Sequence, residues 1–103
     1  MKQGDLKKVE RLLSAPVRLR IMALLIAAPR QDFPTLQKKL DITRGNLSSH
    51  GKQLDDAGYI RIHKSFKNNR PRTTYEITPR GRRAFSEYVS FLEKIITTPD
   101  SEE

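Results

Sequence analysis

The sequence predicts one mainly α-helical domain that also contains a small β-hairpin, which places it in the α+β class. The 103 residues are enough for a single hydrophobic core and too few for two comfortable ones. Apolar residues recur at three- and four-residue steps through most of the chain, a spacing that is typical of helices. Two short segments, 59–65 and 73–78, instead alternate apolar and polar residues and therefore predict strands.

The first third of the chain predicts two helices. Asp5 is expected to cap a short helix over residues 6–13. Ser14 is expected to be the N-cap of the next helix, because Pro16 then falls in the first turn, where its missing N–H costs little. This second helix should run until Pro29 and is apolar on two sides. It is therefore expected to be the hub of the core, either alone or with a share in a subunit contact.

Residues 35–57 predict a helix-turn-helix. Residues 31–34 are interpreted as a short connection, and Thr35 is expected to cap a brief helix, TLQKKL. A turn of three residues, DIT, separates this helix from the stretch TRGNLSSHGKQLDDAGYI, in which Thr43 is the expected N-cap. Two helices joined by so short a turn form this motif.

Residues 59–78 predict the hairpin, with a basic turn at FKNNRPR. Asn68 and Asn69 tolerate turn geometry, and Pro71 is tolerated beyond the hydrogen-bonded ladder. Thr78 is then expected to cap the last helix, residues 79–97. The remaining residues, 98–103, are acidic and are expected to form a frayed tail.

The apolar stripe of the last helix is longer than a small core needs. Together with the helix over 6–13, it predicts a two-fold interface between two copies of the chain. The alternative is a monomer in which the last helix folds back on its own core.

The helix that begins at Thr43 is unusually polar. A helical wheel places Leu47, Gly51 and Leu54 on the side of the core, and hydrogen-bonding side chains cover most of the rest. Arg, Lys, Asn, Gln and Ser are the residue types that read base edges in the major groove. The N-terminus of a helix also suits a phosphate. We expect this face to contact duplex DNA, with an ordinary amphipathic surface helix as the alternative.

The net charge of +8 supports a polyanionic partner, although a merely solvated basic face is the alternative. Residues 44–83 hold ten basic and three acidic side chains, whereas residues 84–103 hold one basic and five acidic ones. Three arginines, Arg80, Arg82 and Arg83, begin the last helix, where cations oppose the helix dipole. A phosphate backbone nearby would explain them.

Several other functions are not expected. The chain has no cysteine, which excludes disulfides and thiolate metal sites, and its charged start and lack of a long apolar run indicate a cytoplasmic protein. His50 and His63 lie in different elements without a carboxylate cluster, so we expect no metal; His50 is interpreted as a DNA-flank or capping residue. Since no catalytic or phosphate-cradling motif is present, we expect neither enzyme activity nor a cofactor.

The order of elements, together with the segments LSSHGKQLDDAGYI and RPRTTYEITPRGRRAF, resembles the winged-helix transcriptional regulators of the MarR and ArsR type, and the small MarR-like proteins most. The resemblance covers residues 6–96. It implies a winged helix-turn-helix with extra N- and C-terminal dimerisation helices, and a homodimer that represses or activates transcription. It also implies that Gly58 is the helix C-terminal glycine in a left-handed conformation. Gly51 departs from the pattern, which usually has a large aliphatic residue there, so either a neighbouring side chain fills the space or the helix is bent or mobile.

In this group, LSSHGKQLDDAGYI resembles the recognition helix and RPRTTYEITPRGRRAF the wing. The resemblance implies that the recognition helix enters the major groove and that the wing lies on the minor groove or its phosphates. On matching positions it assigns contacts with bases and backbone to Thr43, Arg44, Asn46, Ser48, Ser49 and Lys52, and the wing tip to Arg70 and Arg72. The residue pattern adds Gln53 on the same helix, and Lys64 and Lys67 in the hairpin.

The predicted function is that of a sequence-specific, double-stranded DNA-binding transcriptional regulator, acting as a homodimer on an inverted-repeat operator. One alternative is a non-specific or architectural nucleic-acid-binding protein that uses the same charge. Another is a winged-helix module for protein–protein contact. A small-molecule effector is compatible with the sequence, but no residue pattern indicates one.

Overall fold

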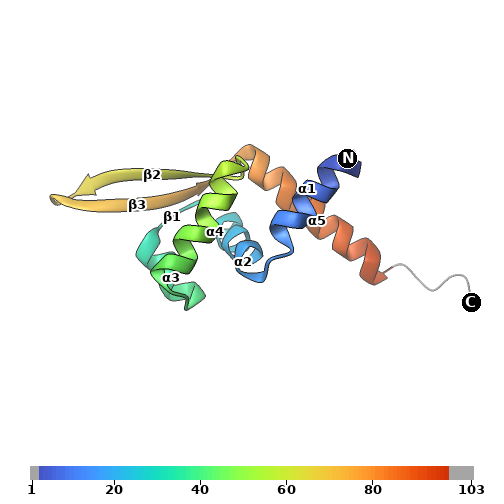
Figure 1. Cartoon of the computed structure of the whole chain (residues 1–103), viewed down its shortest axis with the longest axis horizontal. Helices are drawn as coiled ribbons and strands as arrows, with labels where there is room; N and C mark the ends of the chain where they lie inside the picture. The colour runs from blue at the N-terminus through green and yellow to red at the C-terminus, as the bar shows by residue number, and fades with distance from the viewer. Residues whose placement is uncertain (1–2, 98–103) are drawn as a thin grey trace, which may run out of the picture.

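The computed structural model describes residues 3–97 and confirms a mainly helical fold with a small antiparallel sheet (Figure 1). In chain order the elements are α1 (Gln3–Leu13), α2 (Pro16–Ala27), β1 (Arg30–Asp32), α3 (Phe33–Leu40), α4 (Arg44–Asp56), β2 (Ile60–Lys67), β3 (Arg70–Ile77) and α5 (Pro79–Thr97). The predicted tail, 98–103, lies outside the described residues.

The sheet has the strand order β1-β3-β2, and both pairings are antiparallel. β1 pairs only with the inner end of β3, whereas β2 and β3 pair along their full lengths. Among residues 3–97, no third strand therefore pairs with the outer part of this hairpin. Figure 1 shows it extending away from the helices, while α1 and α5 lie together at the opposite end of the molecule.

α2 is the hub of the core, as its two apolar stripes predicted. Ile21, Met22 and Leu25 are fully buried, and the helix contacts α1, α3, α4, α5 and β3. A helix that is apolar on two sides can be stable only when neighbours cover both sides. The single helix α2 thus holds the polar helix α4 and the terminal helices in one frame.

The start of each of the first two helices differs from the expectation. α1 begins at Gln3, so Asp5 lies inside its first turn and does not cap it. Ser14 still belongs to the end of α1, since its N–H donates to the Glu10 carbonyl (2.9 Å). The N-cap of α2 is Ala15, which makes no side-chain capping bond, because Pro16 occupies the first or second helical position and fixes the start one residue later.

The connection predicted at 31–34 is wrong, because β1 occupies its first two residues and α3 its last two. Asp32, and not Thr35, caps α3: the Asp32 carboxylate accepts a hydrogen bond from the Thr35 N–H (2.9 Å). The amide of Gln31 is buried and donates to the carbonyls of Leu24 (2.6 Å) and Ala28 (2.9 Å) at the end of α2. Three residues are too few to show the alternation of apolar and polar residues that predicts a strand. Residues 30–32 form a strand only because they pair with the distant β3.

The hairpin is longer than predicted and its turn is tighter. Asn68 and Asn69 alone form the turn, with φ of 54° and 63°, and Lys67 lies opposite Arg70 as the closing pair. Pro71 therefore lies inside the ladder, not beyond it, opposite Phe66. In a two-residue hairpin this second pair is the one without hydrogen bonds, so the N–H that Pro71 lacks is not needed.

Candidate nucleic-acid interface

Both ends of α4 are fixed by the residues that the sequence indicated. The Thr43 hydroxyl accepts a hydrogen bond from the Asn46 N–H (3.1 Å), so Thr43 is the N-cap. At the other end Gly58 has φ of +80°, and the Tyr59 N–H donates to the Leu54 carbonyl (2.9 Å). The Gly58 N–H also donates to the Asp55 carbonyl (2.9 Å). The two bonds at this end form a Schellman motif, which requires a left-handed residue and favours glycine. The predicted role of Gly58 is confirmed.

The core side of α4 consists of Leu47, Gly51 and Leu54, as the helical wheel predicted, and all three are buried. Tyr75 of β3 fills the space at Gly51: a Cβ there would lie only 2.6 Å from the Tyr75 Cε2 atom. The Tyr75 hydroxyl donates to the Leu47 carbonyl (3.3 Å). Burial raises the pKa of Tyr75 to about 12, so this hydroxyl remains a donor at neutral pH. Of the two alternatives for Gly51, a neighbouring side chain fills the space.

The outer face of α4 is exposed and forms two stripes. Asn46, Ser49 and Gln53 follow one another at helical spacing on the first stripe. Arg44, Ser48 and Lys52 follow one another on the second stripe, which faces the hairpin. Each of these six side chains is exposed. The helix therefore presents donors and acceptors outward over two adjacent strips of its surface.

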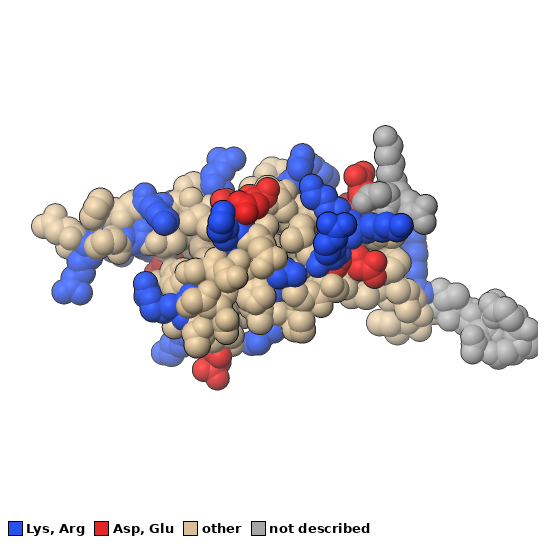
Figure 2. All heavy atoms as spheres, in the orientation of Figure 1, with Lys and Arg blue, Asp and Glu red and all other residues tan. Residues whose placement is uncertain are grey.

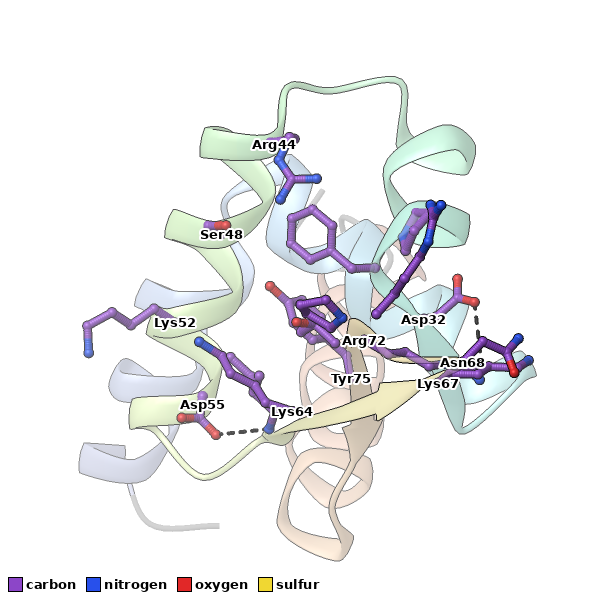
Figure 3. Close-up of a pocket in the computed structure, with 16 residues that line it drawn as sticks. Asp32, Arg44, Ser48, Lys52, Asp55, Lys64, Lys67, Asn68, Arg72 and Tyr75 are labelled. Carbon is purple, nitrogen blue, oxygen red and sulfur yellow. Dashed lines mark hydrogen bonds and ion pairs between the residues drawn. The ribbon is translucent and has the colours of Figure 1, made fainter.

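The second stripe and the β2–β3 hairpin enclose a groove, which we call the α4–hairpin groove (Figure 3). Its volume is about 1010 Å³. Six cationic side chains and two acidic ones line it. The lining residues are Asp32, Phe33, Pro34, Arg44, Ser48, Lys52, Asp55, Ile62, Lys64, Lys67, Asn68, Arg70, Pro71, Arg72, Thr73 and Tyr75.

Seven predicted DNA-binding residues meet in this groove, although they come from segments well separated in sequence. They are Arg44, Ser48, Lys52, Lys64, Lys67, Arg70 and Arg72. The other four, Thr43, Asn46, Ser49 and Gln53, do not line it but are exposed on the outer face of α4 or at its start. On the face drawn in Figure 2, Lys and Arg side chains recur from the hairpin to α1, and acidic side chains form only small clusters.

Two buried aromatic side chains, Phe33 and Tyr75, line the groove. The rings of Phe33 and Tyr75 meet edge to face, with centroids 5.9 Å apart. The Arg44 guanidinium lies 5.4 Å from the centroid of Phe33, within the range of a cation–π contact. Arg44 is thus held over an edge of the groove while its side chain remains exposed.

Two of the predicted cations are paired with carboxylates. Arg72 lies 3.6 Å from Asp32, and hydrogen bonds from Thr35 hold the pKa of Asp32 below its ordinary value, with Arg72 adding to the effect. Arg72 also pairs with Ser65 in the ladder, so it is not at the wing tip; Arg70, next to the turn, is. Lys52 and Asp56 are 3.4 Å apart, but both side chains are exposed, so this ion pair contributes little to stability. Lys52 can therefore exchange Asp56 for another anion at little cost.

His50 does not cap α4 and does not lie free on a DNA-facing flank. Its Nδ1 atom accepts a hydrogen bond from the Arg18 guanidinium (3.1 Å). Arg18 also donates to the Leu12 carbonyl (2.7 Å) at the end of α1. Burial, and after it the charge of Arg18, lower the pKa of His50. The residue is therefore part of a contact that joins α4, α2 and α1.

The arginines at the start of α5 are exposed but do not line the α4–hairpin groove. Arg80 packs against Gly58, close to the C-terminus of α4, where a cation interacts favourably with the helix dipole. Arg80 and Arg83 line a separate cleft that also contains Asp5 and Glu87. Arg80 and Arg83 therefore lie apart from the cations of the α4–hairpin groove.

Asp55 and Asn68 line the groove, yet sequence reasoning did not select them. The Asp55 carboxylate accepts a hydrogen bond from the Ile62 N–H (3.4 Å), so it braces the junction of α4 and β2. Strand alternation gives a signal for only part of the lining, since Ile62 and Lys64 face the same side of the hairpin as Thr73 and Tyr75. Lys67, Arg70 and Arg72 line the groove although alternation assigns them to the other side. No comparable signal exists for Asp55, whose place depends on how β2 docks.

Within residues 3–97 no helix has the length and apolar character needed to cross a membrane. Over the same residues, His, Cys, Asp and Glu side chains form no group of three or more that is arranged to hold a metal ion.

Comparison with known proteins gives consistent results. A family model described as a winged helix DNA-binding domain matches residues 17–96. The chain is 37% identical over 79 residues to the protein MJ0432 of Methanocaldococcus jannaschii, which covers 77% of this chain and 86% of that protein.

Solved structures agree with the family match. A structure of a transcriptional regulator homologue from Pyrococcus horikoshii OT3 has a TM-score of 0.83 and 36% identity, covering 95% of this chain and 99% of that one. A candidate MarR family regulator from Enterococcus faecalis V583 has a TM-score of 0.79 at 20% identity, covering 99% and 92%, and shares the fold.

Proposed function

The chain belongs to the winged helix DNA-binding domain family, and we propose that it is a sequence-specific transcriptional regulator of the MarR and ArsR type that binds an inverted-repeat operator as a homodimer. In this proposal α4 lies in the major groove and the β2–β3 hairpin lies along the adjacent minor groove. Each protomer reads one half-site.

One observation carries the proposal: α4 presents its outer stripe, Asn46, Ser49 and Gln53, without obstruction beside a groove lined by cations. Amide and hydroxyl side chains hydrogen-bond to base edges, whereas Lys and Arg contact phosphates and set the register of the protein on the duplex. The two kinds of side chain lie side by side on this surface. That combination favours sequence-specific binding over binding by charge alone.

The homodimer is supported by the opposite end of the molecule. Ile95 and Ile96 of α5 are 59% and 77% exposed, and they continue the apolar stripe on which Phe91 and Leu92 lie. A second copy of the chain placed there would cover this stripe. Because the C-terminal end of α5 lies at the end of the molecule opposite the hairpin tip in Figure 1, such a dimer leaves both copies of α4 free for DNA.

The experiment is selection of binding sites from random-sequence duplex DNA, followed by affinity measurements on the enriched duplex and on random duplex. We expect an enriched inverted repeat. On it, Asn46→Ala should cost about 1–3 kcal/mol, with a much smaller effect on random duplex, because a base contact is lost. Arg70→Ala should weaken both duplexes alike and reduce the salt slope by about 1.

A selection that returns no enriched sequence would overturn the proposal in favour of a non-specific or architectural nucleic-acid binder. In that case Asn46→Ala and Ser49→Ala would change affinity little, and Arg70→Ala would account for most of the loss. Binding to an acidic protein but to no duplex would instead favour a protein–protein module.

A further inference from the structure

Phe66 is a large apolar side chain that the core does not explain. It is 77% exposed, and within the described residues the other exposed large apolar side chains, Ile95 and Ile96, both lie on α5. Phe66 is thus the one on the hairpin, and it does not pack against the core cluster. The hairpin therefore presents a phenyl ring to solvent, and packing within the described part of the chain does not cover it.

The position of Phe66 in the ladder gives it an apolar neighbour. It lies opposite Pro71, in the pair that follows the closing pair of Lys67 and Arg70. Side chains of a pair without hydrogen bonds approach each other most closely, and Pro71 is also exposed. The two residues together form an apolar patch near the tip of the hairpin, which we call the Phe66–Pro71 patch.

The patch faces the same side of the hairpin as the α4–hairpin groove. Strand alternation places Phe66 on the side of Ile62 and Lys64, both of which line that groove. Pro71 lines the groove itself. The patch therefore continues the proposed DNA-binding surface outward from α4.

Cations surround the patch. Lys64 and Lys67 of β2 and Arg70 of β3 lie within two residues of the patch in sequence, and all three are exposed. An apolar ring framed by cations suits a partner that offers apolar surface between rows of phosphates. The minor groove of duplex DNA offers this arrangement, with sugar faces and base edges between two phosphate backbones.

We propose that the Phe66–Pro71 patch is an apolar wedge that enters the minor groove, where the Phe66 ring packs against sugars and base edges while Lys67 and Arg70 contact the flanking phosphates. This inference rests on the proposed function, since it requires the hairpin to lie on DNA. It adds a contact that binds without charge, so its contribution to affinity is nearly independent of salt.

The affinity test uses the full chain and the duplex enriched by selection, with Phe66→Ala, Phe66→Leu and a matched control, Ser65→Ala. Ser65 is exposed, adjacent to Phe66 and on the opposite side of the strand. Phe66→Ala should weaken binding about tenfold, in the range of lost contacts between aromatic rings and bases, and leave the salt slope unchanged. Phe66→Leu should recover part of the affinity, and Ser65→Ala should match the wild type.

A fluorescence test shows whether the ring is covered by DNA. The chain has no tryptophan, so Phe66→Trp introduces a single reporter. On addition of the enriched duplex its emission should change and its quenching by acrylamide should fall, whereas the reporter in Ser65→Trp should change much less. Unchanged thermal unfolding of Phe66→Ala would show that the loss of affinity does not come from a damaged hairpin.

The outcomes separate the two proposals. A wild-type chain that binds no duplex overturns the proposed function and the wedge with it. Duplex binding that Phe66→Ala does not weaken, or a Phe66→Trp reporter that remains fully accessible to acrylamide in the complex, overturns the wedge alone.

Discussion

Gly51 and Tyr75 form a small and large pair at the contact between α4 and the sheet. Alanine at position 51 would favour the helix by about 1 kcal/mol, but its Cβ would overlap the Tyr75 ring. Because Tyr75 is 1% exposed and its hydroxyl is hydrogen-bonded to the Leu47 carbonyl, moving its ring away disrupts this packing, and we expect Gly51→Ala to lower the free energy of unfolding by about 1–3 kcal/mol. Chemical denaturation measures this change.

Gly45, in the same helix, provides the matched control. Apart from the adjoining residues and the backbone of the helix itself, no atom lies within 4 Å of a Cβ placed at this residue, so Gly45→Ala should be neutral or slightly stabilising. Equal effects of the two substitutions would contradict the pairing of Gly51 with Tyr75. The sequence shows that Gly51 departs from the family pattern, but it does not show that Tyr75 fills the space. The two residues are 24 positions apart in the chain, and only the tertiary fold brings them together.

His50 predicts a pH dependence of stability. Its pKa in the folded chain is lowered below the ordinary 6.5 by burial and by Arg18. Between these two pKa values the unfolded chain binds more protons than the folded chain, so the free energy of unfolding should fall as the pH falls through 6.5. The stability is fully present above 6.5. His50→Gln should remove this part of the pH dependence in denaturation curves collected at several pH values, and an unaltered dependence would contradict the assignment.

At the scale of elements, the sequence predicted what local chemistry determines. α4 was located because Thr43 and Gly58 fix its two ends, and α5 because Pro79 follows a capping Thr78, whose hydroxyl accepts from the Gly81 N–H (2.9 Å). β1 was missed because its three residues become a strand only through pairing with β3. The caps at Ser14 and Thr35 were wrong by one and three residues, where Pro16 and Asp32 decide the helix start.

The hairpin turn predicts a local change in stability. Both turn residues have positive φ, a conformation that glycine adopts without strain and alanine does not. Asn69→Gly should slow hydrogen exchange of the amides in the outer hairpin, and Asn69→Ala should speed it by about tenfold, since the left-handed conformation costs about 1–2 kcal/mol. Amide exchange is the suitable measurement because the outer hairpin is exposed and can open without global unfolding.

Amides in α2 serve as the internal control, since this helix is buried in the core and should exchange at the same rate in both variants. Uniform changes over the whole chain would indicate a global effect and would contradict a turn that acts locally.

Across the whole molecule, the sequence located the basic half of the chain but not the shape that it takes. The cations of α4 and of the hairpin were predicted individually, and the fold brings seven predicted residues into one groove. It also adds Asp32 and Asp55, which only the docking of β1 and β2 places there. Pairing of Arg72 with Asp32, and the separate cleft of Arg80 and Arg83, depend on tertiary contacts that no local pattern encodes.

The arrangement of the two ends of the molecule leads to a test of the homodimer. Aspartate at both Ile95 and Ile96 would place charges on the apolar stripe of α5, and burying them in an interface would be costly. Both side chains are already exposed, so the fold of the monomer should be retained. We expect light scattering to report a monomer and the affinity for the enriched duplex to fall by about 100-fold or more, because two linked half-site contacts become independent.

Ser90→Asp, on the exposed polar side of α5, should leave the dimer and the affinity intact. If the double variant still scatters as a dimer, the interface lies elsewhere, and the spacing of the two copies of α4 on DNA would have to be derived from another surface.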